Sequence, residues 1–407
     1  MLQDIVIGVT ALGILLLLSW PKVRDARIWR ATVTPLASII GSGFLVLGPI
    51  LSHSYGRYAP LVMLLLCLGA YAFGAAIRFN IRNIDHTNDR GRIELALETF
   101  SGWALAFAYC ISVAYYLNLF GAFGVKLTPI NSPVAAKSLT SAVLLLILMV
   151  GWLRGFSAME RMEQTAVTLK LAIIASLIAG LIIYFARQAG QGDLVAMPSP
   201  ETGWSGITLA FGLIITIQGF ETSRYLAEEY KPAVRIRSMR YAQWISTAIY
   251  MVYVVLLTYL FDTKTIPLTE TAIVDMMKVM SAVLPALLVV AALSAQFSAA
   301  IADTSGAGGL VAEQSRGRIS SRAAYLLLVL IGLGLTWVAH IFEIITYASK
   351  AFAFYYAIQC TIAAVGAWRD ARKPHLALFF GACAILALAI LAFGQPVEGH
   401  AASSAHG

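Results

Sequence analysis

Two short segments that could bind a polar solute interrupt long apolar runs of this chain. Gly41-Ser42-Gly43 lies inside the run from about 32 to 51, and Gln218-Gly219-Phe220-Glu221 lies inside the run from about 207 to 227. Glycine weakens a helix, and a backbone N–H or C=O freed in hydrocarbon must find a partner in protein, water or ligand. The N-terminal ends of the resulting half-helices suit a carboxylate, and their C-terminal carbonyl groups suit an ammonium group. The two interruptions are therefore the first candidates for a binding site.

Charged side chains inside the apolar runs are a second set of candidates. Lys170, Arg224 and Lys350 each fall in or close to such a run, as do the acidic Glu221 and Asp303. A charge at membrane depth must be paired or must face water, so these residues are functional candidates by default.

The elements that must position these residues are membrane helices. Charged residues make up 12% of the chain and the mean hydropathy is +0.78, whereas soluble domains carry roughly 25% charged residues. Apolar runs that are continuous rather than alternating indicate α-helices and not a β-barrel. The sequence therefore predicts an all-α polytopic membrane protein with about twelve transmembrane helices. Their expected ranges are 3 to 20, 32 to 52, 60 to 80, 102 to 124, 138 to 153, 164 to 186, 204 to 227, 241 to 261, 279 to 303, 323 to 340, 341 to 367 and 374 to 394.

The distribution of basic residues predicts how these helices are oriented. If the N-terminus faces outward, the loops that become cytoplasmic hold 20 of the 29 Lys and Arg residues. This bias fits the positive-inside rule and explains the net charge of +8 without a nucleic-acid partner. We expect a multi-pass protein of the plasma membrane, in contact with the lipid bilayer and with both termini outside.

The helix count predicts an internal repeat. Segment 1–31 holds an additional helix and a loop, and segment 369–407 holds a trailing helix and a short tail. The ten helices between them divide into five in 32–190 and five in 191–368. Because five is odd, the two halves must be inverted relative to each other, and each begins with one of the broken helices.

Three motifs carry a resemblance to a known family. Ile39-Ile40-Gly41-Ser42-Gly43-Phe44 resembles the broken first helix of the amino acid, polyamine and organocation (APC) transporter superfamily. The run from Gly219-Phe220-Glu221 to Glu228-Glu229 and Pro232 is similar to the sixth core helix of that superfamily, and Gly155-Phe156-Ser157 with Thr165 to Leu171 is similar to its fourth loop and Thr-x-x-Lys-Leu segment. The resemblance covers about 32 to 373. It implies a five-plus-five inverted-repeat fold of the LeuT type, with discontinuous first and sixth core helices.

The resemblance also implies an activity and a substrate site. The expected activity is secondary transport of amino acids or related amines by alternating access around a site at the membrane midplane. Backbone at the two breaks would hold the α-carboxyl and α-amino groups of the substrate, and pocket side chains would set specificity. The residues expected at the site are Ile40, Gly41, Ser42, Gly43, Gln218, Gly219, Phe220 and Glu221 from the breaks, with Tyr109 and Ser112 from the third core helix.

Lys170 is the expected coupling residue. In sodium-independent members of the family, a lysine in this position replaces a sodium ion and meets carbonyl groups of the broken first helix. Ser294 and Ser298 occupy the places where a sodium-dependent relative would supply hydroxyl ligands. A lysine here favours proton coupling or exchange over sodium coupling, while its long side chain also allows plain snorkelling to the inner interface.

The remaining intramembrane charges leave alternatives open. Glu221 and Arg224 are three residues apart and form either an internal ion pair or a gate. Lys350 binds an anionic group, replaces an ion, or pairs with Glu221 or Asp303. The charges from Glu228 to Arg240 are either a solvated face or an inner gate at the cytoplasmic mouth.

Other functions have little support in the sequence. It has no phosphate-binding Gly-x-x-x-x-Gly-Lys, no histidine pair with metal-ligand spacing, and Gly306-Ala307-Gly308-Gly309 is expected to end a helix as a flexible cap. We therefore expect no enzyme activity, no cofactor and no bound metal. The alternative function is a symporter for an inorganic ion or another organic solute on the same fold. The sequence predicts no oligomeric state.

Overall fold

The computed structural model of the protein describes residues 2–41, 43–84, 92–153, 160–225, 230–262, 266–369 and 373–397. These residues form helices and turns, with no strand among them. The first half contains α1 (Leu2–Ser19), α2 (Pro21–Arg24), α3 (Arg27–Ile39), α4 (Gly43–Tyr55), η1 (Gly56–Tyr58), α5 (Ala59–Ile84), α6 (Arg92–Lys126), α7 (Pro133–Leu153) and α8 (Glu160–Gln191). The second half contains α9 (Gly203–Gly212), η2 (Ile214–Ile217), α10 (Thr222–Tyr225), α11 (Pro232–Leu260), α12 (Ala272–Lys278), α13 (Leu284–Gln314), α14 (Ser321–Val338), α15 (Ile341–Arg369) and α16 (Pro374–Phe393).

The helices confirm the predicted all-α polytopic fold. In the described part of the chain, nine helical segments are long and apolar enough to cross a membrane, and the longest of them, Gly43–Asn83, comprises α4 and α5. Both predicted interruptions are present: α3 is separate from α4, and α9 is separate from α10. Each of the twelve expected ranges overlaps at least one helix of the structure.

Several helices extend beyond their apolar runs. The helix expected from 102 begins at Arg92 in α6, and the one expected from 241 begins at Pro232 in α11. The charged segments that were expected to be loops are therefore partly helical. Arg235 shows the reason, because it is buried and donates a hydrogen bond of 2.8 Å to the carbonyl of Arg224. A charge with a protein partner does not end a helix.

The glycine-rich segment Gly306 to Gly309 is not a helix cap, contrary to the sequence prediction. It lies inside α13, which continues to Gln314. A Cβ atom at Gly306 would lie 2.9 Å from the ring of Tyr109, and one at Gly308 would lie 2.2 Å from the ring of Tyr325. These glycines allow α6 and α14 to approach α13 closely, as small residues do in membrane helices.

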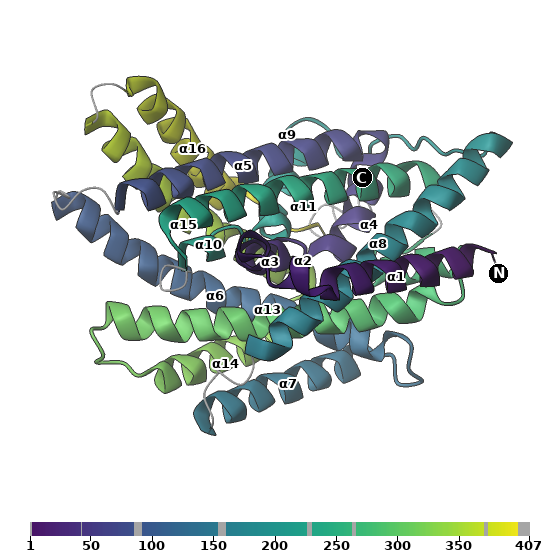
Figure 1. The fold of residues 1–407 in the computed structure, drawn as a ribbon, viewed down its shortest axis with the longest axis horizontal. Helices are drawn as coiled ribbons and strands as arrows, with labels where there is room; N and C mark the ends of the chain where they lie inside the picture. The colour runs from purple at the N-terminus through teal and green to yellow at the C-terminus, as the bar shows by residue number, and fades with distance from the viewer. Residues whose placement is uncertain are drawn as a thin grey trace.

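The arrangement of the helices places the two breaks in the interior (Figure 1). The helices α7 and α14 form one edge of the view and α5 and α16 the other, with α3, α4 and α10 between them. Packing contacts join α6 to both α13 and α15, and α11 to both α3 and α5. Long helices also contact the segments next to the breaks, since α5 and α15 contact η2 and α11 contacts both α3 and α4.

The additional first helix is fixed to the rest of the protein through α8. The side chain of Ile7 is completely buried and reaches the space left by the missing side chain of Gly180. Asp4 accepts a hydrogen bond of 2.6 Å from Ser281. The helix α1 thus packs on the outside of the structure and contributes no residue to either break.

The short α12 is tied to the end of α6 by an acidic residue. Asp275 accepts hydrogen bonds from Lys126 (2.6 Å) and Lys278 (2.9 Å). Burial alone would raise the pKa of this carboxyl group, but the two ammonium donors hold the pKa below its usual value.

The close packing at Gly308 predicts different effects for neighbouring substitutions. Gly308→Ala should destabilise the protein by about 1–3 kcal/mol, because the new methyl group overlaps the ring of Tyr325. Gly309→Ala is the matched control, since a Cβ atom there meets no atom within 4 Å. Thermal unfolding in detergent should show a lower Tm for Gly308→Ala only. Equal Tm values for the two variants would contradict the packing assigned to Gly308.

Candidate functional site

The first break leaves the last carbonyl groups of α3 without helical partners. Two of them are satisfied locally. The Ile40 N–H donates to the carbonyl of Leu36 (3.0 Å), and the Gly41 N–H donates to the carbonyl of Ser38 (3.1 Å). The carbonyl groups of Ala37 and Ile39 need donors from elsewhere. Ser42, one of the expected site residues, lies outside the described residues.

Lys170 and Tyr250 supply these two donors. The Nζ atom of Lys170, whose side chain is 1% exposed, lies 2.5 Å from the carbonyl oxygen of Ala37. The hydroxyl group of Tyr250 lies 3.0 Å from the carbonyl oxygen of Ile39. The ammonium group also lies at the negative end of the α3 dipole, where a cation is favoured. All four terminal carbonyl groups of α3 therefore have hydrogen-bond donors from the protein.

The second break is longer and has its own partners. After α9 ends at Gly212, the chain continues through η2 and then leaves helical geometry from Gln218 to Glu221. Ser349 on α15 bonds to the backbone on both sides of the point where α9 ends and η2 begins. Its hydroxyl donates to the carbonyl of Gly212 (2.7 Å) and accepts from the Ile215 N–H (3.1 Å). Gly219 has a φ angle of +117°, which glycine adopts without the strain that a side chain would add.

The two breaks lie against each other. A Cβ atom at Gly43 would lie 2.5 Å from the Cα atom of Thr216, and one at Gly219 would lie 2.4 Å from the hydroxyl oxygen of Ser38. Tyr250 joins them, because its hydroxyl lies 2.7 Å from the carbonyl oxygen of Thr216 as well as near that of Ile39. The structure thus brings together the two segments that the sequence placed about 180 residues apart.

Glu221 is the acidic residue at the junction of the breaks. Its side chain is completely buried, and its Oε2 atom accepts hydrogen bonds from the Gly219 N–H (3.0 Å) and the Tyr356 hydroxyl (3.1 Å). Its Oε1 atom has no hydrogen-bond donor among the described residues, and neither has the Oε1 atom of Gln218. Two buried acceptor atoms from one segment therefore lack donors, which is costly unless a ligand or water supplies them.

Aromatic rings line the region next to Glu221. Phe220 stacks on Tyr356 with ring centroids 5.3 Å apart, and Tyr356 stacks on Phe73 at 5.1 Å. Phe352 lies 6.2 Å from Tyr356 and 6.0 Å from Tyr109. The helices α5, α6 and α15 and the second break thus contribute one continuous aromatic wall, and it includes two of the expected specificity residues, Tyr109 and Phe220.

Ser112 and Asp303 were proposed for separate roles, and the structure pairs them. The hydroxyl group of Ser112 on α6 donates a short hydrogen bond to Oδ2 of Asp303 on α13. Both side chains are buried. Ser112 therefore contacts a carboxylate rather than the breaks directly.

Ser298 and Ser294 differ in their surroundings. The Ser298 hydroxyl is buried and donates to the carbonyl of Ala295 in its own helix at 3.1 Å. Ser294 is half-buried, and in the part of the chain that the structure describes it makes no side-chain hydrogen bond. At the first break, the Ala37 carbonyl accepts a hydrogen bond from Lys170 and not from Ser294 or Ser298.

Lys350 does not form either of the expected ion pairs. It is half-buried on α15, and within the described ranges it makes no ion pair or hydrogen bond with Glu221 or Asp303. Glu343, its nearest acidic neighbour in sequence, accepts instead from the His340 N–H at 2.7 Å. The pairing alternative for Lys350 is therefore wrong in this conformation.

Arg224 pairs with Glu98 rather than with Glu221. Its guanidinium group makes short hydrogen bonds to Glu98 on α6 and to Gln359 on α15. The amide group of Gln359 also bonds to Ser101 (2.5 Å) and accepts from Asn80 on α5 (2.9 Å). This polar cluster, made of Asn80, Glu98, Ser101, Arg224 and Gln359, joins four helical elements on one side of the breaks.

Comparison with known proteins identifies the family. The model of the APC superfamily transporter family matches residues 21–394, which covers both breaks and leaves out α1. This chain belongs to the APC superfamily of transporters. It is also 39% identical over 410 residues to a protein of Aquifex aeolicus (strain VF5) described only as an uncharacterized protein, with 98% of each chain covered.

Several residues at the centre of this APC superfamily transporter were not predicted from the sequence. Tyr250 and Ser349 complete the breaks, Tyr356 binds Glu221, and Glu98 and Gln359 hold Arg224. The sequence feature that could have indicated these residues is a polar side chain within an apolar run, since buried polar groups in a membrane need partners. Tyrosine and serine are too common in such helices for this signal to single them out.

The shared hydroxyl of Tyr250 predicts a stability difference between two tyrosines of α11. Tyr250→Phe should destabilise this APC superfamily transporter by about 1–3 kcal/mol, because buried carbonyl groups at both breaks lose a donor. Tyr253→Phe is the matched control, since it removes one longer hydrogen bond of 3.3 Å to Leu45. Thermal unfolding in detergent should show a larger decrease in Tm for Tyr250→Phe. A larger loss for Tyr253→Phe would contradict the role given to Tyr250.

Proposed function

We propose that this APC superfamily transporter carries amino acids or related amines through a site at the two breaks. The observation that carries the proposal is the pair of buried acceptors, Oε1 of Glu221 and Oε1 of Gln218, that have no donor among the described residues. An ammonium group offers three donors and a positive charge, and so would satisfy both atoms. The half-helix α4 begins at Gly43, which packs against Thr216 two residues before Gln218, and its N-terminal end would favour the carboxylate of an amino acid.

The α3 carbonyl groups have a different role in this proposal from the one expected from the sequence. They do not hold the substrate ammonium group, because all four already have protein donors. The substrate ammonium group would bind at Glu221 and Gln218 instead. Phe220, Tyr109 and the rest of the aromatic wall would enclose the apolar part of the substrate.

Alternating access would move the two halves, 32–190 and 191–368, around this site. With the termini outside the plasma membrane, the polar cluster around Arg224 would lie on the cytoplasmic side. We propose that it is the inner gate, because it links α5, α6, α10 and α15 and must separate before a solute can pass between them.

The contact between Lys170 and Ala37 supports coupling to protons, or exchange, rather than sodium coupling. The ammonium group of Lys170 donates to the carbonyl that a sodium ion would need, so it would take the place of that ion in the transport cycle. Lys350 has no ion-pair partner in the described part of the chain, and it supports the alternative function, a symporter for an inorganic ion or another organic solute, because it would attract an anionic group.

The substrate class can be tested by ligand-induced stabilisation. A thermal-shift panel of amino acids, polyamines, nucleobases and inorganic ions should raise the Tm only for compounds with a primary ammonium group. Glu221→Gln should abolish the shift, whereas Glu313→Gln, at an exposed position on α13, should keep it. A response to inorganic anions without any response to amines would reject the proposed substrate and favour the alternative.

Lys170 can be tested by transport into proteoliposomes. Wild-type uptake of the compound found in the panel should respond to a proton gradient and not to sodium. Lys170→Ala should lose that response, while Lys137→Ala, in the first turns of α7, should retain it. Sodium-stimulated uptake that persists in Lys170→Ala would count against the coupling role.

The inner gate can be tested by cysteine accessibility. The native cysteines are buried, and so is Ser223, which makes Ser223→Cys a probe beside the polar cluster. Adding Arg224→Gln should increase labelling by a polar thiol reagent at least about tenfold, because it removes the guanidinium group that links the half-buried Glu98 on α6 to Gln359 on α15. Lys278→Gln, which breaks an exposed ion pair elsewhere, should leave the rate unchanged. An unchanged rate in Arg224→Gln would show that the cluster does not close the path.

A further inference from the structure

The chain that follows α16 lies across α9, the half of the second broken helix that precedes the break. The N–H of Gln395 donates a hydrogen bond of 3.0 Å to the carbonyl of Thr208 on α9. A Cβ atom at Gly212, the last residue of α9, would lie 2.1 Å from the carbonyl oxygen of Gln395. The side chain of Val397 is buried. We refer to residues 394–397 as the C-terminal strap.

The strap and the end of α16 contact one face of α9. The ring of Phe393 lies 5.3 Å from that of Trp204, between centroids. Trp204, Thr208 and Gly212 follow one another at intervals of four residues, which places them on one side of a helix. The main packing partners of α9 beyond its own segment are α16 and α15. The strap therefore continues the contact that α16 makes with this half-helix.

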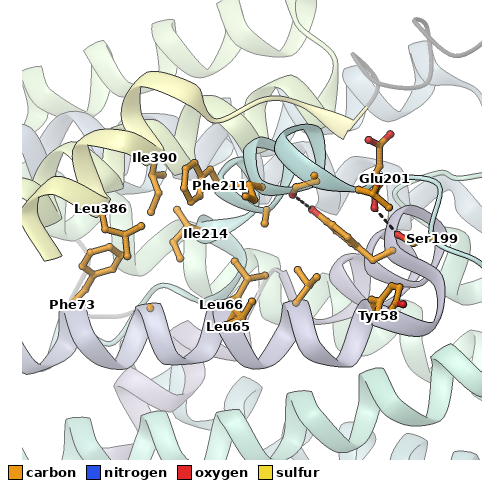
Figure 2. A pocket seen from close by; sticks show the side chains of 18 residues that line it. Tyr58, Leu65, Leu66, Phe73, Ser199, Glu201, Phe211, Ile214, Leu386 and Ile390 are labelled. Carbon is orange, nitrogen blue, oxygen red and sulfur yellow. Dashed lines mark hydrogen bonds between the residues drawn. The ribbon is translucent and has the colours of Figure 1, made fainter. Parts of the chain in front are cut away.

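Another face of α9 borders a cavity of about 520 Å³. Figure 2 shows Leu65 and Leu66 of α5 on one side of it, and Phe211 and Ile214 on the other. Ile207 also lines the cavity from α9. Protein interiors are otherwise closely packed, so a helix beside such a space can shift more easily than its neighbours. The helix α9 thus packs against α16 on one side and has room to move toward α5 on the other.

The start of α9 is attached to the end of α4. The Tyr55 hydroxyl donates to the carbonyl of Gly206 (2.6 Å), and the Glu201 N–H donates to that of Ser54 (3.0 Å). These contacts lie in or before the first turn of α9, whereas the strap and Ser349 hold the part that leads to the break. The start of α9 is therefore the natural pivot, and the strap restrains the end that could swing.

We propose that the C-terminal strap is a latch, and that its release lets α9 pivot into the cavity beside α5. While the strap is in place, it supplies a donor to the Thr208 carbonyl and fills the space beside Gly212. Without it, the Ser349 hydroxyl is left to hold the end of α9. The latch would act on α9 whatever solute the transport site binds, and it would reach the second break because η2 follows α9 directly.

The latch can be tested by cysteine labelling of purified protein in detergent. Thr208→Cys places a thiol at a position where the side chain is 1% exposed, and the native cysteines are buried. In a variant that ends at Gly394, this thiol should react with a polar thiol reagent at least about tenfold faster, because α9 has lost a hydrogen bond and a buried contact. A variant that ends at Val397 is the matched control and should react like the full chain, since it keeps the strap.

A substitution can release the latch without shortening the chain. Gly212→Ala should displace the strap, because the new methyl group overlaps the carbonyl of Gln395. It should speed labelling in the full chain and have no further effect in the variant that ends at Gly394. Thr336→Cys on α14, where the side chain is completely buried, should stay unlabelled throughout and so reports intact folding. An unchanged rate at Thr208→Cys in the shortened variant, with Thr336→Cys protected, would overturn the latch.

The direction of the movement can be tested by filling the cavity. A Cβ atom at Gly69, which lines the cavity, meets no atom within 4 Å. Gly69→Trp should return the labelling rate of the variant that ends at Gly394 to within about twofold of the full chain, because the new ring occupies the space that α9 would enter. Gly334→Trp on α14, with equally open surroundings, should leave the rate high. Fast labelling that persists with Gly69→Trp would overturn movement into the cavity.

Discussion

The end of α3 imposes the main constraint on the centre of this protein. A helix that stops in the middle of a membrane leaves carbonyl groups that hydrocarbon cannot solvate, so the surrounding helices must supply donors. Two donors come from the local chain, one from Lys170 on α8 and one from Tyr250 on α11. The positions of α8 and α11 are thus fixed by a backbone requirement. Since Tyr250 also contacts Thr216, the same requirement draws the second break against the first.

The unpaired backbone groups of the two breaks are satisfied by different kinds of side chain. The first uses a charged side chain, which suits the negative end of a helix dipole. The second uses the neutral Ser349, which donates to one backbone group and accepts from another. At the second break, the side-chain acceptors without a donor among the described residues are Oε1 of Gln218 and Oε1 of Glu221, next to the aromatic wall. The end of α3 thus has protein donors for its carbonyl groups, whereas the second break keeps two buried acceptors that lack them.

The sequence predicts the broken helices well because glycine within an apolar run is a local signal. It predicts their partners poorly, since the contacts between Tyr250 and Ile39 or Ser349 and Gly212 join residues more than 130 positions apart. The sequence prediction placed helix ends at the first charged residues, although some of these residues, such as Arg235, continue the helix. Hydropathy cannot distinguish a charged residue with a protein partner from one in a solvated loop. The partner of Arg224 was not predicted for the same reason. Glu98 lies in the first turns of α6, before the apolar run from which that helix was predicted.

The hydroxyl group of Tyr250 carries a single proton, yet it lies within hydrogen-bond distance of two carbonyl oxygens from separate segments. While α3 and η2 stay together, one donor is enough for both. If the segments separate, one carbonyl keeps the hydrogen bond and the other needs a new donor from water, a ligand or another side chain. Separation of the breaks therefore requires a new donor for one carbonyl group at the point where α3 and η2 now share the Tyr250 hydroxyl.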